Sequence, residues 1–224
     1  SWLTEYFEEE YADGHVRATY LKLAALLHDV AKPETKALQP DGRVRFLGHP
    51  VKGAATTKEI LKRLRSSSKA IESVSLMVDQ HLRPSQLAQK GELPTSRAVY
   101  RYYRDLEDVA VDTLYLCMAD YLAARGPSID LRDWERHCGR MGFTLQEKQV
   151  QETPERRQRL LTGHDLMTFF DLLPGPDLKP ILEMVQENQA AGEVRTKEEA
   201  LTMVSHALGK EPVTSSMQRG GQHV

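Results

Sequence analysis

Five residues in the first 120 positions have the side chains and the surroundings of a metal site. His28 and Asp29 are adjacent, and they lie beside apolar residues at helical spacing: Leu23, Leu26, Leu27 and Val30. An ionised Asp in apolar surroundings is destabilising unless a charge, a metal or several hydrogen bonds compensate it. An adjacent His and Asp can supply one nitrogen and one oxygen to the same cation. The alternative is that Asp29 faces solvent at the end of a helix.

Three further residues have comparable settings. His81 continues the apolar stripe of its own segment, three residues after Val78. Asp120 lies in a run that is apolar nearly all round, and His49 stands just before an expected helix N-terminus. Taken singly, these could be a hydrogen-bonded core histidine, a buried aspartate that caps a neighbouring helix, and an N-cap residue. Together with the first pair, they form a mixed imidazole and carboxylate set of the kind that holds transition metals or Mg²⁺.

The elements that must position these residues are helices. The apolar spacing predicts a helix from Tyr20 to Lys32, ended by Pro33. The sequence Gly48-His49-Pro50 opens another helix, with proline in its first turn. The run from 108 to 124 predicts a central, buried helix, closed by Gly126-Pro127. No segment is a convincing strand.

The pattern changes past about Arg140, where polar residues precede several short helices. We therefore expect a first domain over 1–140, a smaller helical unit over 141–209 and a disordered tail over 210–224. The last helix should begin at a capping box, Thr196-Lys197-Glu198-Glu199. A second pair, His164-Asp165, imitates the first, but it follows a glycine and precedes an amphipathic helix. We assign Asp165 to helix capping and place no metal there.

Composition limits the class of protein. Of the 224 residues, 40% are apolar and 28% are charged, the balance of a globular protein with a sizeable core. The net charge of -2 provides no global positive field for nucleic acid, so any such binding must be local. The two cysteines, Cys117 and Cys138, favour a reducing compartment and a cytoplasmic protein. No apolar stretch approaches the length of a transmembrane helix, and we expect no membrane partner.

Several spaced segments together resemble a known family. The string Leu23 to Pro33, containing His28-Asp29, is similar to the signature of HD-domain metal-dependent phosphohydrolases. The segments that end at His49, His81 and Asp120 fit the later HD positions. The likeness is strongest to the HD region of bacterial CCA-adding enzymes and poly(A) polymerase-like nucleotidyltransferases, over Leu21 to Gly126. It resumes in their C-terminal segment, at Leu161 to Met167, Pro174 to Pro176 and Ala191 to Ala200. The resemblance implies an all-α fold, an HD-domain helical bundle with a smaller C-terminal helical extension.

One part of the family pattern does not match. HD domains usually carry another metal-binding His on a helix well upstream of the His-Asp pair. The upstream candidate is His15, which would lie roughly 20 Å from His28 along a shared helix, too far for one site. We therefore expect His15 in a loop near Asp13-Gly14 and the missing ligand before Ser1. The Gly-Ser motif with paired acidic residues of a nucleotidyltransferase domain is also not found. Two explanations compete, a truncated fragment and a stand-alone relative with a reduced site, and the missing initial Met favours the fragment.

The leading hypothesis is hydrolysis of a phosphate ester. A divalent ion, Mn²⁺, Mg²⁺, Ni²⁺, Co²⁺ or Fe²⁺, would be held by His28, Asp29 and Asp120, with His49 and His81 as further ligands or phosphate contacts. Asp29 would take part in catalysis, with Lys32 contacting phosphate and Glu34 transferring a proton. Solvent exposure is the alternative for both Lys32 and Glu34. The resemblance implies a nucleotide or an RNA 3′ end, possibly of tRNA, as substrate.

The rival hypothesis is a non-catalytic module that positions tRNA for a nucleotidyltransferase domain. Its support is a set of basic residues near tyrosines, which could contact phosphates and stack bases. The candidates are Lys52, Lys62, Arg97, Arg101 and Arg104. A solvated basic face with the tyrosines packed inward is the alternative. A pure assembly domain would show neither turnover nor RNA binding.

Overall fold

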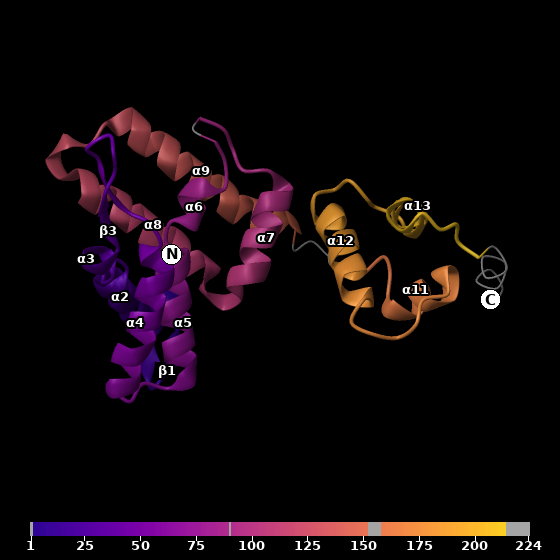
Figure 1. Ribbon diagram of the computed structural model, residues 1–224, viewed down its shortest axis with the longest axis horizontal. Coiled ribbons are helices and arrows are strands. Elements are labelled where there is room, and N and C mark those ends of the chain that lie inside the picture. Colours follow the sequence, from indigo (N-terminus) through magenta and orange to yellow (C-terminus); the bar gives the residue numbers. More distant parts are fainter. Residues whose placement is uncertain (1, 90, 152–157, 214–224) are drawn as a thin grey trace. The chain divides into compact units, whose positions relative to one another are not determined.

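The computed structural model describes residues 2–89, 91–151 and 158–213, and helices dominate this part of the chain (Figure 1). The expected all-α class is confirmed. The chain divides into two compact units, residues 1–94 with 102–145, and residues 95–101 with 146–224. We call these unit 1 and unit 2. The predicted tail, 210–224, lies outside the described residues from position 214 on.

Unit 1 contains the helices that carry the predicted ligands. Its elements are α1 (Trp2–Glu8), α2 (Arg17–Leu27), α3 (Lys32–Thr35), α4 (His49–Arg63), α5 (Ser68–Gln80), α6 (Arg83–Gln86), the C-terminal part of α7 (Ser96–Leu106) from Tyr102 on, a 3-10 turn η1 (Glu107–Val109), α8 (Ala110–Arg125), a second 3-10 turn η2 (Gly126–Ser128) and α9 (Leu131–Gln151) up to Leu145. α4 and α5 lie side by side (Figure 1), and α2 packs on both α5 and α8. Met77 and Leu114 are core residues of this unit that solvent hardly reaches.

Unit 2 has a separate apolar core. It is formed by α11 (Gly163–Phe170), α12 (Leu178–Ala190) and α13 (Lys197–Leu208), with Phe170 and Val204 at its centre. α13 begins at the predicted capping box, in which the Thr196 hydroxyl accepts from the Glu199 amide and the Glu199 side chain accepts from the Thr196 amide. α11 begins in the same way with Thr162 as N-cap and Asp165 as its partner. Asp165 therefore has the predicted capping role, from the third helical position.

The helix that leads to His28 and Asp29 ends earlier than expected. α2 ends at Leu27, and residues 28–31 form turns in which the Val30 amide donates to the Leu27 carbonyl and the Lys32 amide to the Asp29 carbonyl. Pro33 does not end a helix but lies in the first turn of the short α3, where its missing N–H is tolerated. Leu26, expected in the apolar stripe, is 76% exposed. His28 and Asp29 thus lie in a turn directly after the helix, and His28 keeps helical dihedral angles, φ -55° and ψ -32°.

The expectation of no strand was wrong. β1 (Glu10–Ala12) pairs with β2 (His15–Val16), and β3 (Lys36–Leu38) pairs with β4 (Val44–Phe46), both antiparallel. Asp13 and Gly14 both have positive φ, 50° and 73°, as a tight primed hairpin turn requires. The second hairpin also turns at an Asp-Gly pair, with Gly42 at φ 80°. These Asp-Gly signals mark hairpins too short for the alternation of apolar residues to be visible.

The expected central helix is buried in its first half. α8 starts at Ala110 after η1, and its buried stretch ends at Cys117. The remainder faces solvent more openly, and the Asp120 side chain is 29% exposed. Gly126 follows the last helical residue, as predicted from Gly126-Pro127.

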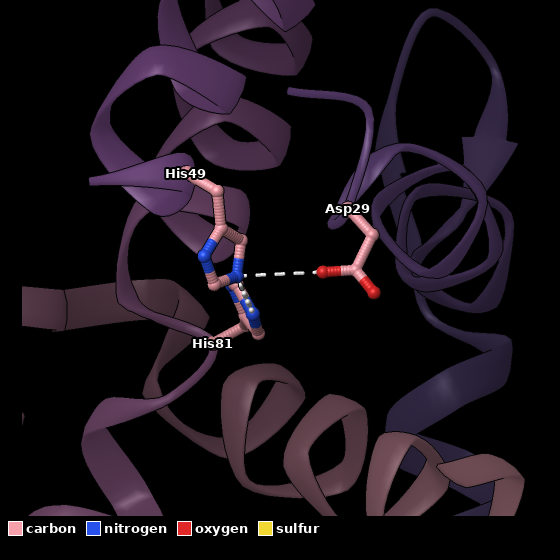
Figure 2. A group of neighbouring side chains, drawn as sticks. All are labelled: Asp29, His49 and His81. Atoms are coloured by element: carbon pink, nitrogen blue, oxygen red, sulfur yellow. Dashed lines mark hydrogen bonds and ion pairs between the residues drawn. The ribbon is translucent and has the colours of Figure 1, made fainter. Parts of the chain in front are cut away.

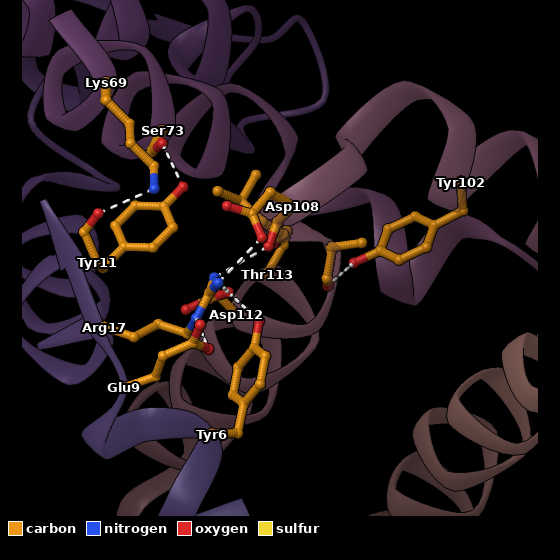
Figure 3. A network of polar contacts seen from close by, with 12 residues as sticks. Tyr6, Glu9, Tyr11, Arg17, Lys69, Ser73, Tyr102, Asp108, Asp112 and Thr113 are labelled. Atoms are coloured by element: carbon orange, nitrogen blue, oxygen red, sulfur yellow. Dashed lines mark hydrogen bonds and ion pairs between the residues drawn. The ribbon is translucent and has the colours of Figure 1, made fainter.

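A polar network inside unit 1 links α2 to α8 (Figure 3). The Arg17 guanidinium, 4% exposed at the residue level, donates to the Asp112 carboxylate at 3.0 Å and to the Asp108 carboxylate at 2.9 Å. Tyr6 donates to the same Asp112 oxygen at 2.6 Å. The rings of Tyr6 and Tyr11 each lie 4.4 Å from the Arg17 guanidinium carbon, so cation–π contacts add to the ion pairs. Because α2 leads to His28 and α8 carries Asp120, this network fixes the two helices that bring those residues together.

Candidate metal centre

Four separate segments bring the five predicted ligands to one place in unit 1. His28 and Asp29 follow the last residue of α2, and His49 is the first residue of α4. His81 follows the last residue of α5, and Asp120 lies on the outer half of α8. Two overlapping groups have ligand atoms within 4.8 Å of one another: Asp29 with His49 and His81, and His28 with Asp29 and Asp120. Asp29 is the residue that they share.

The backbone fixes which nitrogen each imidazole presents. Nδ1 of His28 lies 2.8 Å from the Ala25 carbonyl oxygen, and Nδ1 of His49 lies 2.7 Å from that of Phe46. Nδ1 of His81 lies 2.7 Å from the Val78 carbonyl oxygen. A carbonyl only accepts, so Nδ1 carries the hydrogen and Nε2 has the lone pair in each neutral ring. All three histidines are thus held in the tautomer that can bind a metal through Nε2.

The Nε2 atoms of His28 and His49 lie close to Asp29, and those of His49 and His81 lie close to each other. His49 Nε2 lies 3.4 Å from Asp29 Oδ1 and 3.4 Å from His81 Nε2 (Figure 2). His28 Nε2 lies 3.1 Å from Asp29 Oδ2 and 3.4 Å from Asp120 Oδ1. Two neutral imidazoles that both donate through Nδ1 cannot hydrogen-bond to each other through Nε2. A cation between His49 and His81 resolves this conflict of lone pairs.

Two buried atoms of the centre have no hydrogen-bond partner among the described residues. They are His28 Nε2 and Asp29 Oδ1, both shielded from solvent. Buried acceptors without a donor are destabilising, and a metal ion is a standard way to satisfy several of them at once. The set of imidazole nitrogens and carboxylate oxygens therefore fits a divalent ion, with transition metals preferred to Mg²⁺ by the nitrogen content.

The surroundings shift the pKa values of His28 and His81 in opposite directions. The neighbouring Asp120 carboxylate, whose Oδ1 lies 3.4 Å from His28 Nε2, raises the pKa of His28, and His28 in turn lowers the pKa of Asp120. Burial lowers the pKa of His81, which is 1% exposed. His81 is therefore held neutral, the form that binds a metal.

Lys32 makes the two groups of ligands unequal. Its ammonium lies 2.5 Å from Asp29 Oδ2, so this oxygen already has a cationic partner. Asp29 Oδ1 has no such partner and faces His49. The group of Asp29, His49 and His81 is thus open to a cation as it stands, whereas a cation at the group of His28 and Asp120 competes with Lys32.

The other predicted catalytic and RNA-binding residues lie apart from this convergence. Glu34 pairs with Lys52 at 2.6 Å, and both side chains are about half exposed. Lys62 pairs with Glu59 one turn away, on an exposed face of α4. His15 lies exposed in β2, and His164 lies exposed in unit 2. His15 and His164 belong to neither ligand group.

The three predicted arginines are each held by carboxylates. In unit 2, Arg97 pairs with Glu193 at 2.6 Å and Arg101 pairs with Glu187 at 2.6 Å. Arg97 Nη2 also donates to the Asn188 side chain at 2.7 Å. In unit 1, Arg104 pairs with the adjacent Asp105 at 2.8 Å. A phosphate would have to replace these local partners. The pattern of basic residues in the sequence therefore overstates how available the three arginines are for RNA binding.

Sequence reasoning missed one residue that shapes the centre. A Cβ added to Gly53 of α4 would lie 3.2 Å from Val78 Cγ1 and 3.7 Å from the His28 carbonyl oxygen. Glycine therefore lets α4 approach both the turn after α2 and the residue that orients His81. An isolated glycine inside a helical pattern was the available signal.

Comparisons with known proteins show the family of the chain. A model of the HD domain family matches residues 2–125. The chain is 34% identical over 197 residues to the CC-adding tRNA nucleotidyltransferase of Thermus thermophilus, and 34% identical over 198 residues to the A-adding tRNA nucleotidyltransferase of Deinococcus radiodurans. These matches cover 87% and 86% of the chain and 42% of each relative. The chain thus spans about two fifths of the length of these relatives. None of the described helices is long and apolar enough to cross a membrane.

Proposed function

The chain belongs to the HD domain family, and we propose that it is a metal-dependent phosphohydrolase that acts on a nucleotide or on the phosphate ester at an RNA 3′ end. The observation that carries the proposal is the convergence of His28, Asp29, His49, His81 and Asp120, with every imidazole fixed to present Nε2. Aligned lone pairs of this kind have no use in a purely structural cluster, because they repel one another.

The residues of the centre would have different roles in hydrolysis. A divalent ion bound here would supply an activated water near neutral pH and would offset the charge of the phosphoryl group. Asp29 would hold it through Oδ1, and His49 and His81 through Nε2. Lys32, with its ammonium on Asp29 Oδ2 and its side chain 38% exposed, can turn to contact a phosphate oxygen. Glu34 is proposed for proton transfer, which requires it to leave Lys52.

The substrate class rests on the relatives. Both are named as tRNA nucleotidyltransferases, and the similarity covers unit 2 as well as unit 1. We propose that this chain is part of a similar protein and that its substrate is a nucleotide or an RNA 3′ end, such as that of tRNA. The two free cysteines are consistent with a cytoplasmic location.

The test compares two histidines that each precede an aspartate. His28→Ala and His164→Ala are purified beside the wild type, stripped of metal and reloaded with Mn²⁺. Turnover of cyclic nucleotides, of a simple phosphomonoester and of RNA with a 3′ phosphate is then measured. We expect metal-dependent turnover in the wild type and in His164→Ala, and background turnover in His28→Ala. Equal activity in the two variants would remove the proposal.

A second candidate is a module that positions tRNA without catalysis. It is favoured by the names of the relatives and by the basic residues Lys52 and Lys62 on the exposed side of α4. Salt-dependent tRNA binding that Lys52→Ala and Lys62→Ala weaken, in a protein with no metal-dependent turnover, would establish this reading over the first.

A further inference from the structure

A second group of aromatic and basic side chains, separate from the ligands, lies between α8 and α9 in unit 1. Its members are Cys117, Tyr121 and Arg125 from α8 and Trp134, His137 and Arg140 from α9. We call this set the α8–α9 cluster. Tyr121 follows Asp120 directly, and the Asp120 carboxylate acts on the Cys117 thiol by raising its pKa, behind the larger effect of burial. The cluster therefore borders the metal centre through α8.

The aromatic members form a stack. The His137 ring lies parallel to the Tyr121 ring, with centroids 4.3 Å apart and planes inclined by 17°. Trp134 lies 5.7 Å from Tyr121 and 6.0 Å from His137. The Arg125 guanidinium covers the Tyr121 ring at 3.4 Å. His137 is buried and supports the stack from inside, whereas Trp134 and Tyr121 are partly exposed.

The two arginines of the cluster have no acidic partner among the described residues. Among the described residues, neither Arg125 nor Arg140 has a carboxylate within ion-pair distance, in contrast to Arg17, Arg83, Arg97, Arg101 and Arg104. The Arg140 Nε and the His137 Nδ1 are buried and have no hydrogen-bond partner there. Burial and then the two arginine charges lower the pKa of His137, so the ring itself stays neutral.

Cys117 contacts the imidazole of the cluster from its buried side. Burial raises the pKa of Cys117 to about 11, so its thiol keeps the proton at neutral pH. The Cys117 Sγ lies 4.0 Å from His137 Nε2, which places the S–H where it can donate to that nitrogen. The cluster thus holds two guanidinium groups with no carboxylate partner among the described residues. One N–H of Arg125 donates to the Tyr121 carbonyl oxygen at 3.2 Å, and the buried Arg140 Nε has no hydrogen-bond partner there.

Unpaired guanidinium groups beside an aromatic surface favour a ligand that is both planar and anionic. Arginine binds phosphate through its planar fork of donors, and an exposed indole is a platform on which any base can stack. We propose that the α8–α9 cluster binds one nucleotide unit, with the base on Trp134 beside Arg125 and the phosphate at Arg140. The unit can be a free nucleotide or one residue of a single-stranded RNA. This nucleotide unit would be the substrate of the neighbouring metal centre. Only that connection rests on the proposed function, and the binding site itself does not.

Binding is measured in the full chain by the fluorescence of Trp134, in a Trp2→Phe background that removes the other indole. The probes are adenosine monophosphate, a short single-stranded oligoadenylate, adenosine and ribose 5-phosphate. The variants are Arg125→Gln and Arg140→Gln. Arg136→Gln is the matched control, because Arg136 is an exposed residue of the same helix that already pairs with Asp133.

We expect saturable quenching by the monophosphate or the oligoadenylate, with weaker binding of adenosine and little quenching by ribose 5-phosphate. Each of Arg125→Gln and Arg140→Gln should weaken binding by about tenfold or more, and Arg136→Gln should not. Tighter binding of the oligoadenylate identifies RNA as the source of the unit, and tighter binding of the monophosphate identifies the free nucleotide. The absence of saturable quenching by both, or equal binding in all three variants, would overturn the site. His28→Ala, the variant that tests the hydrolase proposal, should keep the quenching. The failure of one proposal can therefore be told apart from the failure of the other.

Discussion

Replacing Asp112 with alanine should destabilise unit 1 and loosen its metal centre. Asp112 is 1% exposed and accepts from both Arg17 and Tyr6. Removing one partner of a buried ion pair costs about 3–5 kcal/mol, because the other charge is left uncompensated. Arg17 keeps its bond to Asp108 at 2.9 Å, so we expect the lower end, about 3 kcal/mol. For a chain of this size, that corresponds to a fall in Tm of about 6–12 °C.

Thermal and urea unfolding followed by circular dichroism measure this loss. Glu59→Ala is the control, since its pair with Lys62 is exposed and should contribute less than about 1 kcal/mol. The double variant Arg17→Met with Asp112→Leu should regain much of the stability, because it removes both charges from the interior. A loss in Asp112→Ala no larger than in Glu59→Ala would refute the reasoning. So would a double variant less stable than the single one.

Three further outcomes follow from the same contacts. Mn²⁺ at about 100 times its Kd should stabilise the folded chain by about 2.7 kcal/mol, and hence raise Tm by about 5–10 °C, in calorimetric scans of the wild type but not of His49→Gln. The pKa of Asp165 is lowered by hydrogen bonds from Lys197 and Thr162 that outweigh its burial. Its contribution to stability is therefore present above the ordinary carboxyl pKa and is lost as the pH falls through the lowered value. Hydrogen exchange of the α11 amides should accelerate on acidification in the wild type and change less in Asp165→Asn. Thiol modification at pH 8 should reach Cys138 before the buried Cys117, whose thiol pKa is about 11, and mass spectrometry of the modified peptides would show the reverse order if Cys117 were accessible.

The sequence was informative about the centre because its residues belong to strong local patterns. His49 next to Pro50 was expected at a helix start, where α4 begins. His81 was expected on the inward stripe of its helix, and it is buried directly after the last residue of α5. The exact end of α2 was not predictable, since nothing between Leu27 and Pro33 breaks a helix. Tertiary contacts decide it there, and they turn Asp29 toward His49.

The other differences between the predictions from the sequence and the structure come from contacts between residues that are far apart in the chain. Arg97 and Arg101 belong to a basic pattern, but Glu187, 86 residues beyond Arg101, neutralises it in unit 2. Asp112 was visible as a carboxylate in an apolar run, yet its partner Arg17 is 95 residues away. Such long-range pairs leave no periodic signal. The hairpins were missed for the opposite reason, because two or three residues are too few for alternation, although Asp13-Gly14 and Asp41-Gly42 are local turn signals.

Calorimetric titration of the metal-free chain with Mn²⁺ tests the central claim most directly. Asp29 belongs to both groups of ligands, so Asp29→Ala should remove binding altogether. Asp165→Ala, at the other His-Asp pair, should leave the Kd and the stoichiometry of the wild type unchanged. A wild type that takes up no divalent ion, or an Asp29→Ala variant that binds as the wild type does, would contradict the assignment of a metal centre to these five residues.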